Sequence, residues 1–121
     1  MRILLADDSA FWRAELQTIL ETEPGWTVFQ ATNGAEAVQR SISIHPDSVI
    51  LDVCMPVLDG LSAARQFQRM WPEVPVLILT ADKNAFVEVK ARECGAVAVF
   101  SKMECLELRK FLRNRFLAAA A

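Results

Sequence analysis

Short, largely apolar runs alternate along this chain with longer stretches whose apolar residues recur at helical spacing. The runs predict five strands, at residues 3–6, 27–31, 48–51, 76–79 and 97–100. Apolar residues three and four positions apart on a polar background are typical of amphipathic helices. They predict a helix beginning after Ser9 and four more helices, at about 34–43, 60–71, 84–94 and 104–117.

The first predicted helix illustrates the pattern. Ser9 is its expected N-cap, since a serine side chain accepts a bond from the free N–H groups of a helix start. A stripe of four apolar residues follows and is expected to face the core: Trp12, Leu16, Ile19 and Leu20. Gly95 is the expected C-cap of the fourth helix. At the chain end, residues 118–121 are expected to fray.

The strands are apolar at consecutive positions rather than alternate ones, which indicates a parallel sheet covered on both faces. Short strand–helix units with right-handed crossovers wind such a sheet in both directions. The pattern therefore predicts a doubly wound (βα)5 α/β fold, a three-layer sandwich of helices, sheet and helices. With 121 residues, the chain is expected to form a single domain over 1–121.

The composition argues against several classes of function. Charged residues make up 23% of the chain and the net charge is −2, so no basic surplus points to nucleic-acid binding. No apolar run approaches the roughly 20 residues of a membrane span, and a strand beginning at Arg2 leaves no room for a cleaved signal peptide. Three cysteines without a CxxC pair fit reduced thiols. These features together favour a cytoplasmic protein.

Polar residues stand where four of the five predicted strands end. Asp7 and Asp8 follow the first strand, Asp52 the third, Thr80 the fourth and Lys102 the fifth. The carboxyl ends of parallel strands lie along one rim, which is where doubly wound sheets bind their ligands. We therefore expect three carboxylates, a hydroxyl and an amine to converge there.

Three neighbouring carboxylates raise one another's pKa unless a counter-charge is present. A hard divalent cation with oxygen ligands meets that need, and a site with few protein oxygens suits Mg²⁺, which keeps several waters and takes oxygens from a phosphate. Lys102 supplies a mobile point charge for phosphoryl oxygens. A carboxylate nucleophile, a metal, an amine and a hydroxyl are the parts needed for phosphoryl transfer to an aspartate.

The chain also carries a set of ordered motifs: Asp7-Asp8, Asp52-x-x-Met55-Pro56-x-x-Asp59-Gly60, Thr80-Ala81, and Gly95 seven residues before Lys102. In this order and spacing the chain resembles the receiver domain of two-component response regulators over essentially its whole length. Its opening Asp-Asp-Ser-Ala-Phe-Trp-Arg and its Lys-Met-Glu are most similar to receivers that precede a helix-turn-helix domain. The resemblance implies a flavodoxin-like fold with strand order 2-1-3-4-5.

The resemblance also implies a role for each site residue. Asp52 would be the phosphoacceptor for a histidine kinase, a phosphotransfer protein or a small phosphodonor. Thr80, the Ala81 N–H and Lys102 would contact the phosphoryl group. Mg²⁺, the implied cofactor, would be bound by Asp8, Asp52 and the Cys54 backbone carbonyl directly, and by Asp7 through water. The side chains of Cys54 and Asp82 would tune the hydrolysis of the acyl phosphate.

Phosphorylation adds roughly two negative charges at the rim. In the family it draws the threonine inward and reshapes the face of the fourth helix, fifth strand and fifth helix, which would control an output partner or domain or support a homodimer. The chain would then be a phosphorelay switch and not an enzyme beyond its own phosphorylation and dephosphorylation. No nucleic-acid or membrane contact by this domain is expected.

Two positions depart from the family pattern. The family usually has Tyr or Phe three residues before the lysine, where this chain has Val99, with Phe100 one residue later. Successive strand side chains point to opposite faces, so Phe100 is not expected to substitute. The common Lys-Pro is replaced by Lys102-Met103, for which we expect a trans peptide bond. These departures keep one alternative open, a receiver-fold binding module that works without phosphorylation.

Other interpretations fit less well. An aspartate-nucleophile phosphatase usually has Asp-x-Asp after its first strand, and a flavodoxin-like cofactor binder needs a phosphate-cradling loop that Asp7-Asp8 would repel. Asp59-Gly60 is interpreted as a tight turn into the third helix, and the cysteines as small apolar residues. Phe11 is not explained by the core stripe and is expected to be exposed.

Overall fold

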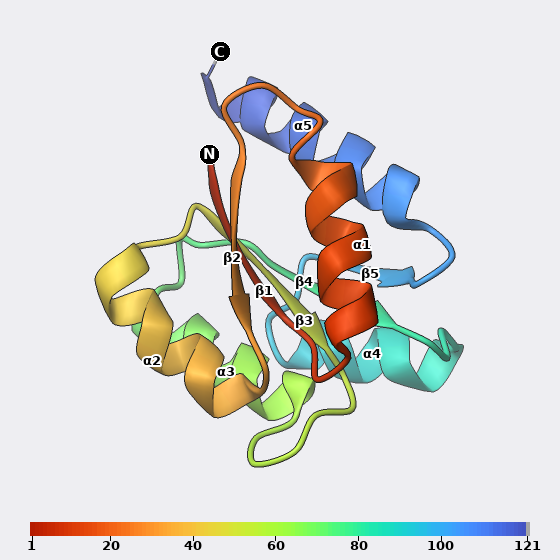
Figure 1. The fold of residues 1–121 in the computed structure, drawn as a ribbon. Coiled ribbons are helices and arrows are strands. Elements are labelled where there is room, and N and C mark those ends of the chain that lie inside the picture. Colours follow the sequence, from red (N-terminus) through yellow and green to blue (C-terminus); the bar gives the residue numbers. More distant parts are fainter. Residues whose placement is uncertain (121) are drawn as a thin grey trace.

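The fold alternates five strands with five helices (Figure 1). It comes from a computed structural model that describes residues 1–120, with side chains described through residue 118. The strands are β1 (Arg2–Ala6), β2 (Thr27–Ala31), β3 (Ser48–Asp52), β4 (Val76–Thr80) and β5 (Ala98–Ser101). The helices are α1 (Ala10–Leu20), α2 (Gly34–Ile44), α3 (Gly60–Met70), α4 (Ala85–Glu93) and α5 (Cys105–Ala120).

All strand pairs are parallel, and the strand order is β2-β1-β3-β4-β5. The winding reverses between β1 and β3, so the gap beyond their carboxyl ends is the place where this fold class binds ligands. In the register, Ala6 of β1 pairs with Leu51 of β3, which brings the residues after β1 beside the end of β3. The predicted (βα)5 fold, with order 2-1-3-4-5, is confirmed.

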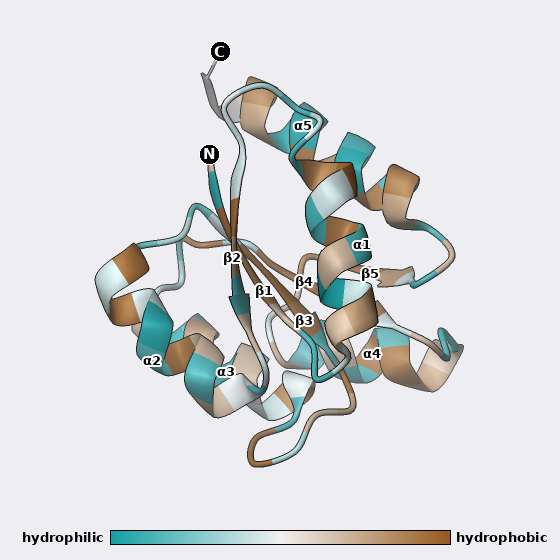
Figure 2. Ribbon diagram, viewed as in Figure 1, coloured by the Kyte–Doolittle hydropathy of each residue, from teal (hydrophilic) through white to brown (hydrophobic). Residues whose placement is uncertain are grey.

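Helices cover both faces of the sheet (Figure 1). Side chains from α1 and α5 pack on one face, around Ile3, Leu5 and Leu108, whereas α2, α3 and α4 pack on the other, around Leu4, Leu51 and Phe67. Figure 2 shows the resulting pattern, with hydrophobic strands at the centre and helices of mixed hydropathy around them. Burial on both faces explains why the strand sequences are apolar at consecutive positions.

Four helices begin at a polar N-cap whose side chain accepts a backbone N–H three residues on. These caps are Ser9, Asn33, Asp59 and Asn84. A side-chain oxygen at this position satisfies one of the donors that a helix start leaves free, so the sequence itself sets these boundaries. The C-cap of α4 is Cys94 and not Gly95 as predicted; Gly95 follows it with φ +96°, a conformation that glycine adopts at little cost.

Two further helical predictions need correction. Trp12 was predicted to join the core stripe of α1, but within the described residues neither core group contains it, and it is only partly buried. The helix α5 runs on to Ala120, beyond the predicted end near residue 117, because the alanines there have high helix propensity. The predicted fraying of residues 118–121 is untested, and Ala121 lies outside the described residues.

Among the residues that the structure describes, none of the helices combines the length and the hydropathy needed to cross a bilayer. The cysteines are free thiols; Cys94 and Cys105 are buried and Cys54 is exposed. Burial of two of the three agrees with their interpretation as small apolar residues. Phe11 is 64% exposed, as expected from its place outside the apolar stripe of α1.

Candidate functional site

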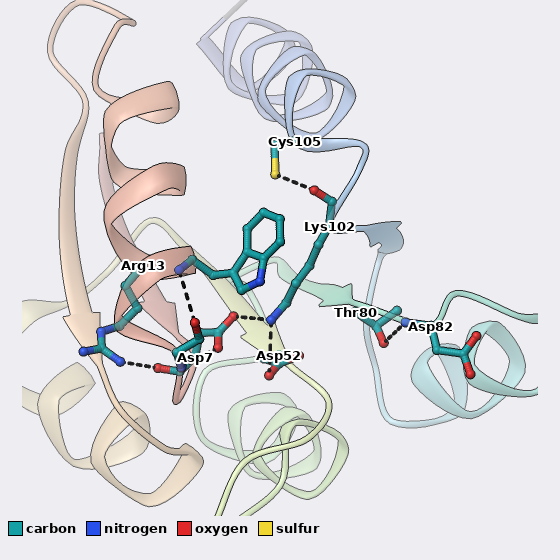
Figure 3. A network of polar contacts seen from close by, with 9 residues as sticks. Asp7, Arg13, Asp52, Thr80, Asp82, Lys102 and Cys105 are labelled. Atoms are coloured by element: carbon teal, nitrogen blue, oxygen red, sulfur yellow. Dashed lines mark hydrogen bonds and ion pairs between the residues drawn. The ribbon is translucent and has the colours of Figure 1, made fainter.

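Three carboxylates meet at the rim where β1 and β3 end. Oxygen atoms of Asp7, Asp8 and Asp52 all lie within 4.8 Å of one another. Asp7 and Asp52 are buried, with exposed fractions of 1% and 6%, whereas Asp8 is exposed. The predicted convergence of these acids is therefore present in the fold, and Figure 3 shows Asp7 and Asp52 next to each other at this rim. Buried carboxylates at this spacing repel one another unless a cation compensates them.

The Lys102 side chain extends from the turn after β5 toward the acids (Figure 3). Its Nζ lies 2.7 Å from Asp7 Oδ2 and 3.7 Å from Asp52 Oδ2. The side chain is only 9% exposed, so the ammonium is largely removed from water. The Lys102 backbone N–H donates to the Thr80 carbonyl at 2.9 Å, which fixes the start of this turn against β4.

The turn after β1 is fixed by backbone and side-chain bonds around Asp7. The Asp7 N–H donates to the Ala31 carbonyl, and Asp7 Oδ1 accepts the Ser9 N–H at 2.9 Å. The Arg13 guanidinium donates to the Asp7 carbonyl at 2.7 Å and to Gln30 Oε1 at 3.0 Å. These bonds join the end of β1, the start of α1 and the edge strand β2, so Asp7 has little freedom to move.

The end of β3 is held by the close approach of α3. The Gly60 N–H donates to the Val53 carbonyl at 3.0 Å, and a Cβ atom added at Gly60 would lie 1.9 Å from the Asp52 carbonyl oxygen. Only a residue without a side chain fits there. Asp59 is the N-cap of α3, as the interpretation of a turn into this helix implied, but Gly60 does more than turn the chain, because it lets the helix pack against the backbone of Asp52.

The pKa of the Asp52 carboxyl is raised from 3.8 to about 6, and burial is the largest cause of this rise. The neighbouring charge of Asp7 contributes to the rise, and the Lys102 ammonium opposes it. One lysine therefore does not compensate the acids fully. The site as built holds excess negative charge, and a divalent cation with oxygen ligands is the group that such a donor set accepts.

Thr80 lies at the end of β4 and is 5% exposed. Its Oγ1 accepts the Asp82 N–H at 3.2 Å, so the hydroxyl oxygen is engaged with the loop after β4 (Figure 3). Ala81 and Asp82 are both exposed. Thr80 thus stands on the same rim as the acids, and the loop that follows it is open to solvent.

The remaining predicted positions lie around this rim. Cys54, two residues beyond Asp52, is exposed. Val99 packs among side chains on the α2–α3–α4 side of the sheet, whereas Phe100 packs on the other side, with its ring 5.7 Å from that of Phe111. The prediction that Phe100 does not occupy the place of the usual aromatic is therefore confirmed. The Lys102–Met103 bond is trans, as expected.

Sequence reasoning missed a contact of Trp12. The centroid of its ring lies 5.4 Å from Lys102 Nζ, within range of a cation–π interaction. Helical spacing placed Trp12 on the apolar stripe, and periodicity alone does not distinguish a core residue from one at the end of the stripe that faces the rim. The signal that was available is its position, five residues after Asp7 in the first turn of α1.

A family model described as the response regulator receiver domain matches residues 3–112. The chain belongs to this family. A protein-glutamate methylesterase/protein-glutamine glutaminase of Methanosarcina acetivorans is 37% identical to this receiver over 107 residues, which are 86% of this chain and 30% of that protein. The receiver thus spans about 30% of the length of this curated relative.

Solved structures agree with this assignment. The response regulator domain of Thermotoga maritima CheB is 27% identical, with a TM-score of 0.82, covering 98% of this chain and 95% of that chain. A LuxR-family two-component response regulator from Aurantimonas is also 27% identical, with a TM-score of 0.89, covering 97% of this chain and 85% of that chain. The flavodoxin-like receiver fold is therefore shared by proteins of different output classes.

Proposed function

We propose that Asp52 is the phosphoacceptor of a phosphorelay switch. The observation that carries the proposal is the meeting of Asp7, Asp8 and Asp52 within 4.8 Å, with the Lys102 ammonium 3.7 Å from the Asp52 carboxylate. Asp52 is the member of this cluster at the end of the central strand β3, beside both other acids and the lysine. The membership of the chain in the receiver family supports the same assignment.

The donor set fits Mg²⁺. The three side chains offer hard carboxylate oxygens. The pKa of Asp52 is raised first by burial and then by the neighbouring acid charges, which Lys102 opposes but does not cancel. Asp8 and Asp52 would bind the ion directly, together with the Cys54 carbonyl, and Asp7 would bind it through water. A bound Mg²⁺ would neutralise the acids and polarise the phosphoryl oxygens.

In the transfer, a carboxylate oxygen of Asp52 attacks phosphorus. A new O–P bond forms and the P–N bond of a phosphohistidine breaks. The departing imidazole nitrogen takes a proton from solvent. The Lys102 ammonium pairs with a phosphoryl oxygen, while the Thr80 hydroxyl and the Ala81 N–H donate to others. Burial of Asp52 keeps bulk water away from the reacting carboxylate, which strengthens these charge interactions.

Phosphorylation would act through Thr80. Its Oγ1 accepts the Asp82 N–H, and turning the hydroxyl toward a phosphoryl group breaks this bond and moves the loop after β4. The surface of α4, β5 and α5 would change with the loop and bind an output partner, a fused output domain or a second copy of the chain.

The methylesterase and glutaminase activities named for the curated relatives are theirs, and this receiver would have no enzymatic role beyond its own phosphorylation and dephosphorylation. It would work in the cytoplasm, where sensor kinases and phosphotransfer proteins present the phosphoryl group.

A binding module that works without phosphorylation is the second candidate. Val99 favours this candidate, because it stands where the family usually has the aromatic side chain that moves together with the threonine. Phe100 does not replace that side chain, since it packs on the opposite face of the sheet. Beryllofluoride with Mg²⁺, which mimics the phosphoryl group, separates the two functions. Amide shifts that reach α4 and α5 support the switch, whereas shifts confined to the pocket support the second candidate.

Intact mass after incubation with acetyl phosphate and Mg²⁺ tests the proposal. The wild type is expected to gain the mass of one phosphoryl group, and Asp52→Asn is expected to gain none. Glu73→Gln, which changes an exposed acid before β4 at the opposite end of the sheet, serves as the control and should be phosphorylated. No gain in a folded wild type would overturn the proposal and favour the second candidate.

A further inference from the structure

Trp12 is a partly buried aromatic residue that core packing does not explain. It lies in the first turn of α1, and its backbone N–H donates to Ser9 Oγ at 3.4 Å. Within the described part of the chain, neither group of core side chains includes it. Its ring instead lies beside the Lys102 ammonium, at 5.4 Å from centroid to Nζ. The Trp12 side chain therefore contacts the site and is not part of the described core groups.

The surroundings strengthen this contact. Tryptophan has the most favourable ring face for a cation, and the attraction grows when the cation loses its water. The Lys102 side chain is only 9% exposed. Another cation–π pair in this protein, Lys90 with Phe86 at 5.8 Å, shows the contrast, because Phe86 is 68% exposed and the Lys90 side chain is 45% exposed.

The indole differs from the other groups that hold Lys102 in carrying no charge. Asp7 and Asp52, the two carboxylates within 4 Å of the ammonium, are also members of the acid cluster. Any cation bound by that cluster competes with Lys102 for the same oxygens. The ring has no oxygen ligand for a hydrated divalent cation, so its attraction for the ammonium persists when the carboxylates bind that cation.

The turn after β1 also fixes where the indole stands. Asp7 Oδ1 accepts the Ser9 N–H, and Ser9 Oγ in turn accepts the Trp12 N–H. The carboxylate nearest the ammonium and the aromatic ring beside it are thus held by one capping turn. Lys102 is contacted from both ends of this turn.

We propose that Trp12 is a positioning residue that holds the Lys102 ammonium beside Asp52 when the carboxylates bind a divalent cation. This inference rests on the proposed phosphoacceptor function. Without the ring, the ammonium on its four-carbon stem has more freedom to leave the pocket once Asp7 no longer pairs with it. Fewer molecules then present it to the incoming phosphoryl oxygens.

The rate of phosphorylation by acetyl phosphate with saturating Mg²⁺, followed by intact mass, provides one test. Trp12→Leu keeps an apolar side chain but removes the ring, and is expected to react about fivefold more slowly. Trp12→Phe keeps a weaker ring and should recover part of the rate. Phe86→Leu, which removes the exposed cation–π pair on α4, is the matched control and should react at the wild-type rate.

The chemical shifts of the Lys102 ε-CH₂ protons provide a second readout that does not depend on phosphorylation. Ring currents should move them upfield in the wild type, with and without Mg²⁺, and Trp12→Leu should lose this displacement. Equal rates for wild type and Trp12→Leu, or ε-CH₂ shifts that return to ordinary values when Mg²⁺ is added to the wild type, overturn the inference alone. A folded wild type that accepts no phosphoryl group overturns the proposed function and this inference with it.

Discussion

Lys102 Nζ lies 2.7 Å from Asp7 Oδ2 but 3.7 Å from Asp52 Oδ2. The ammonium therefore compensates Asp7 more closely than the residue proposed to accept the phosphoryl group. Burial and the charge of Asp7 raise the pKa of Asp52 to about 6 in spite of the nearby lysine. Positive charge beside the acceptor carboxylate is therefore too small to offset burial and the neighbouring acids, which disfavours the ionised form of Asp52 until a cation binds.

This imbalance predicts that Asp52→Asn stabilises the protein in EDTA. Because the folded pKa of about 6 exceeds the ordinary 3.8, ionising Asp52 costs folding free energy. That cost is absent below about pH 4, grows between pH 4 and 6, and is complete at pH 7.5. Denaturant unfolding should show a gain of about 1–3 kcal/mol for Asp52→Asn at pH 7.5 and a much smaller gain at pH 4.

The exposed Asp82 supplies the control for this measurement. Asp82→Asn should change the free energy of unfolding by less than about 0.5 kcal/mol, as is usual for surface positions. A loss of stability in Asp52→Asn at pH 7.5 would show that the acids do not repel one another in the folded protein.

Mg²⁺ should stabilise the wild type, because a ligand that binds only the folded state raises the free energy of unfolding by mass action. The gain is about 1.4 kcal/mol at ten times the dissociation constant, and EDTA should reverse it. Asp8→Asn removes one carboxylate of the cluster and should lose most of the gain. Thermal unfolding with increasing Mg²⁺ measures this effect, and equal stabilisation of wild type and Asp8→Asn would place the ion elsewhere.

Gly60→Ala should destabilise the protein by about 3 kcal/mol, because the new Cβ atom would meet the Asp52 carbonyl oxygen at 1.9 Å and force α3 away from β3. Gly25→Ala is the matched control. Gly25 has φ +79° with nothing within 4 Å of an added Cβ, so this change costs only the left-handed backbone, about 1 kcal/mol. Urea denaturation compares the two variants, and equal losses would contradict the close approach of α3.

Val57→Gly should stabilise the protein. Val57 has φ +69° although it is β-branched, and the Leu58 N–H donates to the Pro56 carbonyl across it, which defines a strained three-residue turn. Its side chain is 84% exposed, so removing it sacrifices little packing. Relief of the strain, less the entropy that glycine adds to the unfolded chain, should leave a gain of about 0.5–1 kcal/mol in chemical denaturation. Val57→Ala keeps the Cβ atom and should gain less; a net loss in Val57→Gly would show that the turn is not strained.

Most of the fold could be predicted from the sequence because each element has a local cause. The capping residues Ser9, Asn33 and Asn84 lie where helices were predicted to begin, and β2 has the predicted bounds. The acid cluster could be predicted because topology alone brings the carboxyl ends of β1 and β3 together. No side-chain geometry was needed for that step.

The contacts of Trp12 and Gly60 could not be predicted in the same way. Helical spacing assigns Trp12 to the apolar stripe of α1. It does not show which end of that stripe extends beyond the sheet and lies at the rim where the acids meet. The need for glycine at position 60 arises from how far α3 descends onto β3, and this depends on packing across the whole α2–α3–α4 layer. Both are tertiary effects that a local pattern does not contain.

The most direct measurement for the central claim is the identity of the residue that carries the phosphoryl group. Borohydride reduction after treatment with acetyl phosphate and Mg²⁺ converts an aspartyl phosphate to homoserine, and peptide mass spectrometry then locates it. The conversion is predicted at Asp52 and at no other aspartate. Conversion at Asp8 or Asp59, or none in a protein that binds Mg²⁺, would contradict the proposed acceptor.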